Sequence, residues 1–152
     1  NPKLIWYAGG RINLWTGLVS HKGIRQYDNE KFNLEGATKY ATGCCFCMRY
    51  DNFKNIGGFD ENFPMYSEDV DLSLSIRKNG FQVWFTPNSK IWHKVSASIG
   101  GSFSFSKNRR KLMGLFLLYR KHGNLFQYIT IILFMPFQLL YQIIKLAFTC
   151  KK

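Results

Sequence analysis

The sequence predicts a mixed α/β fold followed by C-terminal helices. Three observations carry this prediction: short β-prone runs that end at glycine or proline, one helix with clear terminal signals, and a long apolar stretch near the C-terminus. The chain has 152 residues, of which 17% are aromatic. A chain of this length and composition can bury one hydrophobic core, so we expect a folded protein rather than a disordered one.

The best-defined element is a helix over residues 68–78. Ser67 is its expected N-cap, and three acids in the first turn would meet the positive end of the helix dipole: Glu68, Asp69 and Asp71. Asn79-Gly80 is a good C-terminal stop. Val70, Leu72, Leu74 and Ile76 alternate with polar residues, which also fits a strand. The terminal signals favour the helix, which would then be buried on two sides.

Four segments predict strands, because aromatic and β-branched residues are enriched in them: 3–8, 39–49, 81–86 and 90–95. Gly9-Gly10 ends the first of these, either as a plain turn or as a point where a ligand approaches the backbone closely. Residues 11–36 are polar and glycine-punctuated, which predicts surface loops with at most one short strand. An exposed His21 without a role is the expectation there. Asp51 is expected to cap a helical turn at 53–56 that Gly57 ends.

The C-terminal third begins with small residues over 96–106, which predict a loop able to move over a site. A helix over 107–122 follows, with Gly123 after its last turn. The first turn of this helix is basic, from Lys107 to Lys111. Positive charge there opposes the helix dipole, so an anionic partner would explain it.

Residues 125–149 are apolar, and Lys145 is their only charged residue. The length suits a membrane span of roughly 20 residues. Pro136 and three glutamines make an interfacial or re-entrant helix pair an alternative, and a buried core helix is a third interpretation. Lys151-Lys152 would mark a cytoplasmic end.

The net charge of +12 is unevenly distributed along the chain. All nine acids lie at or before Asp71, whereas residues 72–152 carry thirteen basic residues and no acid. This asymmetry predicts an anionic neighbour for the second half, with a solvated basic face as the alternative. The cysteines, Cys44, Cys45, Cys47 and Cys150, lack zinc-ligand spacing, and we expect buried, reduced thiols.

Two joined motifs resemble those of a known enzyme family. Gly57-Gly58-Phe59-Asp60-Glu61 followed by Tyr66-Ser67-Glu68-Asp69-Val70-Asp71-Leu72 is similar to the acidic motif of family 2 of the inverting glycosyltransferases, which have the GT-A fold. Three further stretches match in the expected order: Trp6-Tyr7-Ala8-Gly9-Gly10, Ala41-Thr42-Gly43-Cys44-Cys45 and Ile91-Trp92-His93. The resemblance covers roughly residues 4–101. It implies inverting transfer of a sugar from a nucleotide-sugar donor to a saccharide or lipid-linked acceptor, in the synthesis of cell-surface polysaccharide.

The resemblance also implies roles for individual residues. Asp69 matches the catalytic base, which takes the proton of the acceptor hydroxyl, and Glu68 matches a neighbour that helps to hold the acceptor. The alternative is that these acids only complement the helix end. The remaining substrate-binding candidates are Thr42, Gly43, Cys44 and Trp92, the last of which can stack on a sugar ring or pack in the core. His93 resembles a histidine that in some relatives ligates the metal or touches the diphosphate, with a core histidine as the alternative.

One part of the family pattern is missing from the chain. The nucleotide-binding half, with its Asp-x-Asp metal motif, would precede residue 1. We therefore expect an acceptor-side part of a GT-A domain over 1–101, a basic amphipathic helix over 102–123, and a membrane-associated or transmembrane segment over 124–152. The complete enzyme would use Mg²⁺ or Mn²⁺, held mainly by residues upstream, at the cytoplasmic face of the cell membrane, and this chain alone would be inactive.

The alternative from another class is a non-catalytic basic module that binds an anionic membrane or nucleic acid. Five carboxylates between Asp60 and Asp71 argue against nucleic acid, because they would repel its phosphates.

Overall fold

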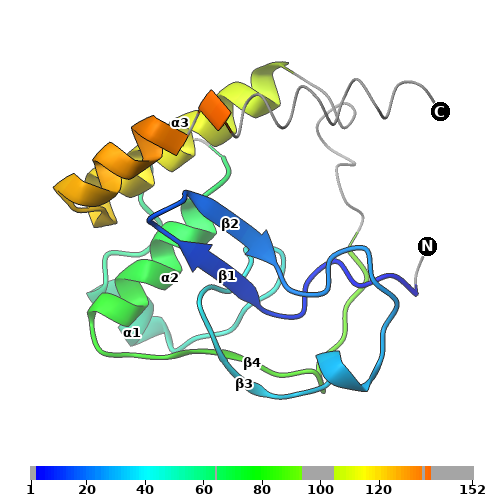
Figure 1. Ribbon diagram of the computed structural model, residues 1–152. Helices are drawn as coiled ribbons and strands as arrows, with labels where there is room; N and C mark the ends of the chain where they lie inside the picture. Colours follow the sequence, from blue (N-terminus) through cyan, green and yellow to red (C-terminus); the bar gives the residue numbers. More distant parts are fainter. Residues whose placement is uncertain (1–2, 64, 94–104, 135, 138–152) are drawn as a thin grey trace, which may run out of the picture.

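The computed structural model describes residues 3–63, 65–93, 105–134 and 136–137. This part of the chain has a mixed α/β arrangement with two small sheets, as the sequence predicts. In Figure 1, α3 (Phe105–His122) and the helical residues after it run along one side of the molecule. The strands and α2 (Glu68–Lys78) lie beneath them.

A β-hairpin occupies the segment that was expected to be mostly loop. β1 (Gly10–Asn13) pairs antiparallel with β2 (Leu18–His21), with Gly10 opposite His21 and Asn13 opposite Leu18. The connecting turn uses Gly17 at a φ of +69°, a left-handed conformation that glycine adopts readily. A 3-10 turn, η1 (Glu30–Phe32), follows. The prediction of at most one short strand in 11–36 was therefore wrong.

Residues 3–8 do not form the regular strand that was predicted. Leu4 makes an isolated bridge with Tyr27, and the Ile5 amide donates to the Gln26 carbonyl at 2.8 Å. The facing chain turns sharply, because Gly23 and Arg25 both have positive φ. A chain that turns in this way cannot present an evenly spaced row of backbone partners, so the pairing stays irregular.

The second sheet joins β3 (Gly36–Thr38) to β4 (Val83–Phe85) in an antiparallel pair. A strand within 81–86 is confirmed, although it is shorter than expected. The predicted strand over 39–49 was wrong, because its backbone amides bond to side chains of α2. The Ala41 amide donates to Ser73 Oγ at 3.1 Å and the Gly43 amide to Asp69 Oδ2 at 3.0 Å.

The predicted strand over 90–95 is also absent as far as the chain is described. Residues 90–93 have no regular structure and are exposed, and residues 94 and 95 lie outside the described residues.

Helix α1 (Tyr50–Asn55) confirms the helical turn predicted before Gly57. Its N-cap is Arg49, and Asp51 lies inside the first turn, so the predicted cap was wrong. The helix ends where Gly57 and Gly58 adopt φ values of +88° and +66°. Left-handed residues at this point terminate the helix, as glycine commonly does.

Helix α2 has the bounds that the sequence predicts, but its N-terminus differs. Ser67 has a φ of +73° and makes no side-chain capping hydrogen bond, so the predicted Ser67 cap was wrong. The buried residues lie in the first half of the helix: Val70, Asp71, Leu72 and Ser73. Val70 joins the core cluster with Tyr40, Phe63 and Leu118. The last residues of the helix are exposed, so burial on two sides holds only for the first half.

Helix α3 confirms the helix predicted over 107–122 and begins two residues earlier. Residues 105 and 106, which were expected to end the loop at 96–106, are therefore helical. Residues 96–104 lie outside the described residues. Leu118 and Tyr119 of α3 are buried, and the Tyr119 hydroxyl donates to the carbonyl of Leu14 before the hairpin turn. These contacts fix α3 to the hairpin as well as to α2.

Residues 125–134 and 136–137 are helical and return beside α3, where the Tyr128 ring meets the rings of Phe116 and Tyr119. Within the described ranges, no helix is long and apolar enough to cross a membrane. Residues 138–149 of the apolar stretch that was predicted to associate with a membrane lie outside the described residues.

Candidate active site

The candidate site is built on the turn that leads into α2. Tyr66 and Ser67, two consecutive non-glycine residues, have φ values of +71° and +73°. A side chain in this region costs on the order of 1–3 kcal/mol, and such conformations cluster at functional sites. The turn places Glu68 and Asp69 in the first turn of α2, where the helix dipole favours negative charge.

The Asp69 carboxylate lies against the backbone of the loop at residues 41–44. Its Oδ2 accepts the Gly43 amide at 3.0 Å, and its Oδ1 accepts the Val70 amide at 2.8 Å. The Asp69 carbonyl accepts Ser73 Oγ, which in turn accepts the Ala41 amide. The loop is therefore fastened to the first two turns of α2. Each carboxylate oxygen has a second lone pair, so Asp69 can still accept a proton or a hydroxyl hydrogen bond.

The neighbouring carboxyl group, Glu68, has a different environment. Its Oε2 is buried and has no hydrogen-bond partner among the described residues. Burial raises the pKa of Glu68, and the charge of Asp69 acts in the same direction, while the backbone amides of Glu68 and Tyr66 oppose it. A buried carboxyl oxygen without a hydrogen-bond partner is unusual in proteins. Such an oxygen is free to form a hydrogen bond with a bound ligand. Two adjacent carboxyl groups in unequal environments can take different protonation roles.

An aromatic wall of Tyr7, His21 and Tyr40 lies within electrostatic reach of Asp69. The His21 ring is 5.4 Å from Tyr7 and 6.0 Å from Tyr40, centroid to centroid, and the Tyr7 hydroxyl donates to the Tyr40 carbonyl. Burial raises the pKa of Tyr7 to about 12, and the charge of Asp69 adds to this shift. Burial, and then Asp69, also raise the pKa of Tyr40.

His21 was not predicted as a site residue, and its expected exposure was wrong. The ring is half-buried, and its Nδ1 lies 3.0 Å from the Trp6 carbonyl oxygen. Burial lowers the pKa of His21, the Trp6 carbonyl and Asp69 act in the opposite direction, and Lys111 adds to the lowering. The nearby residues in the sequence, Ser20 and Lys22, carry no signal of this position. Only recognition of the hairpin would have placed His21 opposite Gly10.

His93 is exposed, and its ring centroid lies 4.6 Å from that of Trp6. Among the residues that the structure describes, no three His, Cys, Asp or Glu side chains gather closely enough to hold a metal ion. A single imidazole does not fit Mg²⁺ or Mn²⁺, which take several oxygen ligands. The described residues by themselves therefore do not fit the metal that the resemblance implies.

The other predicted substrate-binding residues divide by exposure. Thr42 is buried, and its Oγ1 lies 2.8 Å from Cys44 Sγ, so the hydroxyl serves the loop rather than an open pocket. Gly43 and Cys44 are exposed beside Asp69, whereas Trp92 is 76% exposed, which overturns the core-packing alternative for it.

The predicted burial of the cysteines was wrong for every cysteine that the structure describes. Cys44, Cys45 and Cys47 are free and exposed, because the segment forms an outer loop over α2 instead of a core strand. Cys150 lies outside the described residues.

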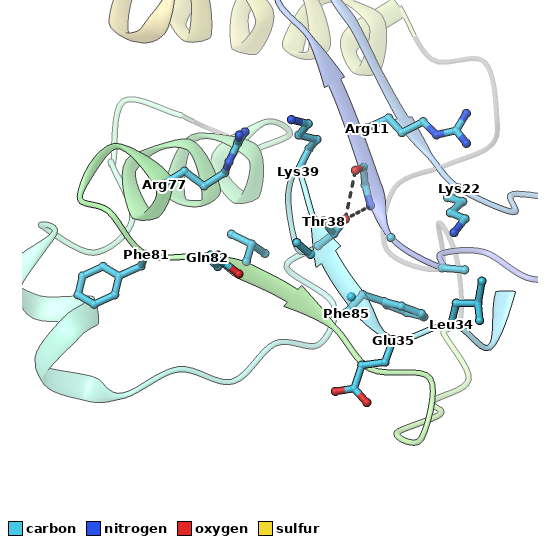
Figure 2. Close-up of a pocket in the computed structure, with 16 residues that line it drawn as sticks. Arg11, Lys22, Leu34, Glu35, Thr38, Lys39, Arg77, Phe81, Gln82 and Phe85 are labelled. Carbon is cyan, nitrogen blue, oxygen red and sulfur yellow. Dashed lines mark hydrogen bonds between the residues drawn. The ribbon is translucent and has the colours of Figure 1, made fainter.

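A cavity of about 620 Å³ lies elsewhere, between the hairpin, the β3–β4 sheet and the end of α2. Figure 2 shows its basic residues, Arg11, Lys22, Lys39 and Arg77, around the Thr38–Gly10 contact, with Glu35 as the one carboxylate drawn. Neither Glu68 nor Asp69 lines this cavity. The carboxyl pair and the aromatic wall hold titratable side chains close together, so we take them as the candidate site.

Paired carboxyl groups in a helix first turn, beside a glycine loop and an aromatic wall, define a site suited to removing a proton from a hydroxyl. Residues 15–114, most of the chain, match the family described as "Glycosyltransferase like family 2". The chain therefore belongs to this family, and the resemblance noted in the sequence is confirmed.

Curated relatives match shorter parts of the chain. An N-acetylglucosaminyl-diphospho-decaprenol L-rhamnosyltransferase of Mycobacterium tuberculosis is 36% identical over 61 residues, which are 40% of this chain and 20% of the relative. The O-antigen biosynthesis protein RfbC of Myxococcus xanthus is 37% identical over 100 residues, 62% of this chain and 8% of the relative. The succinoglycan biosynthesis protein ExoA of Rhizobium meliloti is 31% identical over 74 residues, 41% of this chain and 22% of the relative.

The chain thus spans less than a quarter of the length of each of these relatives. No solved structure matches the chain.

Proposed function

We propose that this chain is the acceptor-side part of an inverting, nucleotide-sugar-dependent glycosyltransferase with the GT-A fold, and that Asp69 is its general base. The observation that supports this most directly is the placement of Asp69. Its carboxylate is held by the Gly43 amide at the start of α2, beside the Glu68 oxygen that has no hydrogen-bond partner in the described part of the chain, within the stretch that matches the family.

The proposed reaction is a single displacement at the anomeric carbon of the donor sugar. An acceptor hydroxyl donates its proton to the Asp69 carboxylate as its oxygen bonds to the anomeric carbon. The bond from this carbon to the nucleoside diphosphate breaks on the opposite face, and the diphosphate leaves with the electron pair. Attack opposite to the leaving group inverts the configuration.

The neighbouring residues would bind and orient the acceptor. Glu68 would accept or donate a hydrogen bond through its buried Oε2, and Trp92 would stack on a sugar ring with its exposed face. Gly43 and Cys44 lie at the surface beside Asp69, where a saccharide can approach. Thr42 would act indirectly, by shaping the loop through its contact with Cys44.

The names of the relatives support the proposed acceptor class. The mycobacterial relative is named for transfer of rhamnose to a lipid-linked N-acetylglucosaminyl diphosphate, and two others for O-antigen and succinoglycan biosynthesis. We therefore propose a saccharide or lipid-linked acceptor used in cell-surface polysaccharide synthesis. Residues 1–101 would form the acceptor side, and nucleotide binding would need further residues. Residues 1–152 alone should then bind nucleoside diphosphates no more tightly than about millimolar.

Association with the cytoplasmic face of the membrane is a second part of the proposal. Two apolar groups of residues are exposed on adjoining helices: Leu112, Met113 and Phe116 on α3, and Leu125, Phe126, Ile129, Ile132, Leu133, Phe134 and Phe137 after it. Arg109, Arg110, Lys111 and Arg120 are exposed on α3. A large apolar face with basic residues suits an anionic bilayer surface. Residues 102–123 would be the basic helix and 124–152 the membrane segment.

The competing class, a non-catalytic basic module, makes a different prediction. It would bind mixed-sequence DNA at physiological ionic strength, with an affinity that falls steeply with salt.

The test of the proposal is transfer of a labelled sugar by the complete enzyme, with Asp69→Asn compared against Asp51→Asn, an exposed acid in the first turn of α1. Selective loss with Asp69→Asn supports the base, and equal activity of the two variants refutes it.

A further inference from the structure

Helix α3 contacts the turn that carries the candidate base. A Cβ atom added to Gly114 would lie 2.7 Å from the Tyr66 carbonyl oxygen and 2.8 Å from Ser67 Oγ. The backbone of α3 therefore packs directly against the two left-handed residues that precede Glu68 and Asp69. A residue with a side chain has no room at position 114. The nearest atom, at 2.7 Å, is the backbone carbonyl oxygen of Tyr66, which cannot move aside as a flexible side chain could.

The same helix also joins the two ends of the acidic motif. Lys121 Nζ lies 2.8 Å from Asp60 Oδ2, on the loop that enters the turn, and 2.9 Å from Asp71 Oδ2, on the helix that leaves it. His122 Nε2 lies 2.7 Å from the other Asp71 oxygen, and both of these side chains are buried, at 7% and 1% exposure. The segment from Asp60 to Asp71 is thus closed into a loop by α3, with Gly114 against its middle.

We propose that α3 positions the candidate base, with Gly114, Lys121 and His122 as positioning residues that hold the Tyr66–Ser67 turn and so set where α2 begins. If α2 began one residue earlier or later, Asp69 would rotate by roughly 100° about the helix axis. It would then lose the Gly43 amide. The inference rests on the proposed function only in taking Asp69 as the base. The contacts of α3 with the Tyr66–Ser67 turn and with Asp71 can be tested without any sugar transfer.

The test uses the ¹⁵N-labelled 152-residue chain and reads the Gly43 amide by NMR. This amide donates to Asp69 Oδ2 and therefore reports the position of the carboxylate. In Gly114→Ala we expect hydrogen exchange at the Gly43 amide to be at least about tenfold faster than in the wild type, because the bond to Asp69 opens. The matched control is Gly36→Ala, since a Cβ there meets nothing within 4 Å. Gly36→Ala should leave exchange at Gly43 unchanged.

A second pair of variants decides the matter if Gly114→Ala does not fold. His122→Gln keeps a hydrogen-bond donor for Asp71, whereas His122→Ala removes it. The proposal expects faster exchange at Gly43 in His122→Ala and near-normal exchange in His122→Gln. Unchanged exchange at Gly43 in folded Gly114→Ala or His122→Ala overturns the proposal, as does an equal effect of Gly36→Ala. Because no outcome depends on sugar transfer, failure here is distinct from failure of the proposed function.

Discussion

The Asp69 carboxylate accepts the backbone amide of Gly43 at 3.0 Å, across 26 residues of sequence. This contact joins two motifs that the sequence singles out separately, the Ala41–Cys45 stretch and the acidic motif. It places a charged acceptor beside an exposed loop, and it accounts for the absence of a strand at 39–49. The proposed chemistry depends on this relationship.

Replacement of Asp71 should damage stability more than chemistry. Asp71 faces α3 rather than Gly43, and it is 1% exposed with partners at 2.7 and 2.9 Å. Removing one member of a buried, hydrogen-bonded charge network typically costs about 3 kcal/mol or more. We expect Asp71→Asn to lower the free energy of unfolding by that order, measured by urea denaturation. Asp51→Asn, on the exposed surface of α1, should change it by less than about 0.5 kcal/mol. Equal effects would contradict the α2–α3 network.

Low pH should weaken the same network, because it protonates the Asp60 carboxylate. The hydrogen bond from Lys121, followed by those from Asn62, lowers the pKa of Asp60 from 3.8 to about 2. A lowered pKa means that the folded state favours the charged form, so this contribution is present above about pH 4 and lost between about pH 4 and 2. The pair is partly exposed, so the contribution should stay below about 1 kcal/mol.

The measurement is urea denaturation of wild type and Asp60→Asn between pH 2 and 6. We expect the difference in unfolding free energy between them to shrink as the pH falls through this window. Glu61→Gln, at the next residue, is the control and should follow the wild type. A constant difference at every pH would show that the Lys121–Asp60 contact does not persist in solution.

Membrane association should depend on the exposed residues that follow α3. Leu125, Phe126 and Phe137 are 73%, 69% and 70% exposed. Removing an apolar side chain of this size from water contributes roughly 1.5–3 kcal/mol. Replacing all three by serine should therefore reduce co-sedimentation with anionic vesicles at least tenfold. Tyr50→Ser, at a site 73% exposed on α1, should have no effect. Unchanged binding of the triple variant would place the contact elsewhere.

The sequence correctly predicted the helices whose ends are set by residues close to them in the chain. The bounds of α2 follow from its acidic first turn and the Asn79-Gly80 stop, and α3 ends as expected before Gly123. The predictions that failed depend on distant partners. Ser67 cannot cap α2 in a left-handed turn that α3 packs against, and the amides of residues 41 and 43 bond to α2 side chains.

The candidate site shows the same division. Asp69, Glu68 and Gly43 were predicted from their motifs, and the structure brings these three together. His21 and Tyr7 were not predicted, because their approach to Asp69 depends on the hairpin and on tertiary packing. The cysteines were given the wrong exposure for a related reason, since burial along a presumed strand does not apply to a loop.

The most direct test of the central claim is sugar transfer by the complete enzyme carrying Asp69→Asn. Asparagine keeps the shape of the side chain, and its one carbonyl oxygen can accept one of the two backbone amides that the carboxylate accepts, from Gly43 or from Val70, but it cannot take the acceptor proton. Loss of a general base typically lowers the rate by 10²- to 10⁴-fold, so we expect about this loss in kcat, with little change in acceptor binding or thermal stability. Near-normal kcat in a folded Asp69→Asn enzyme would show that Asp69 only complements the helix end, and the account of catalysis would be wrong.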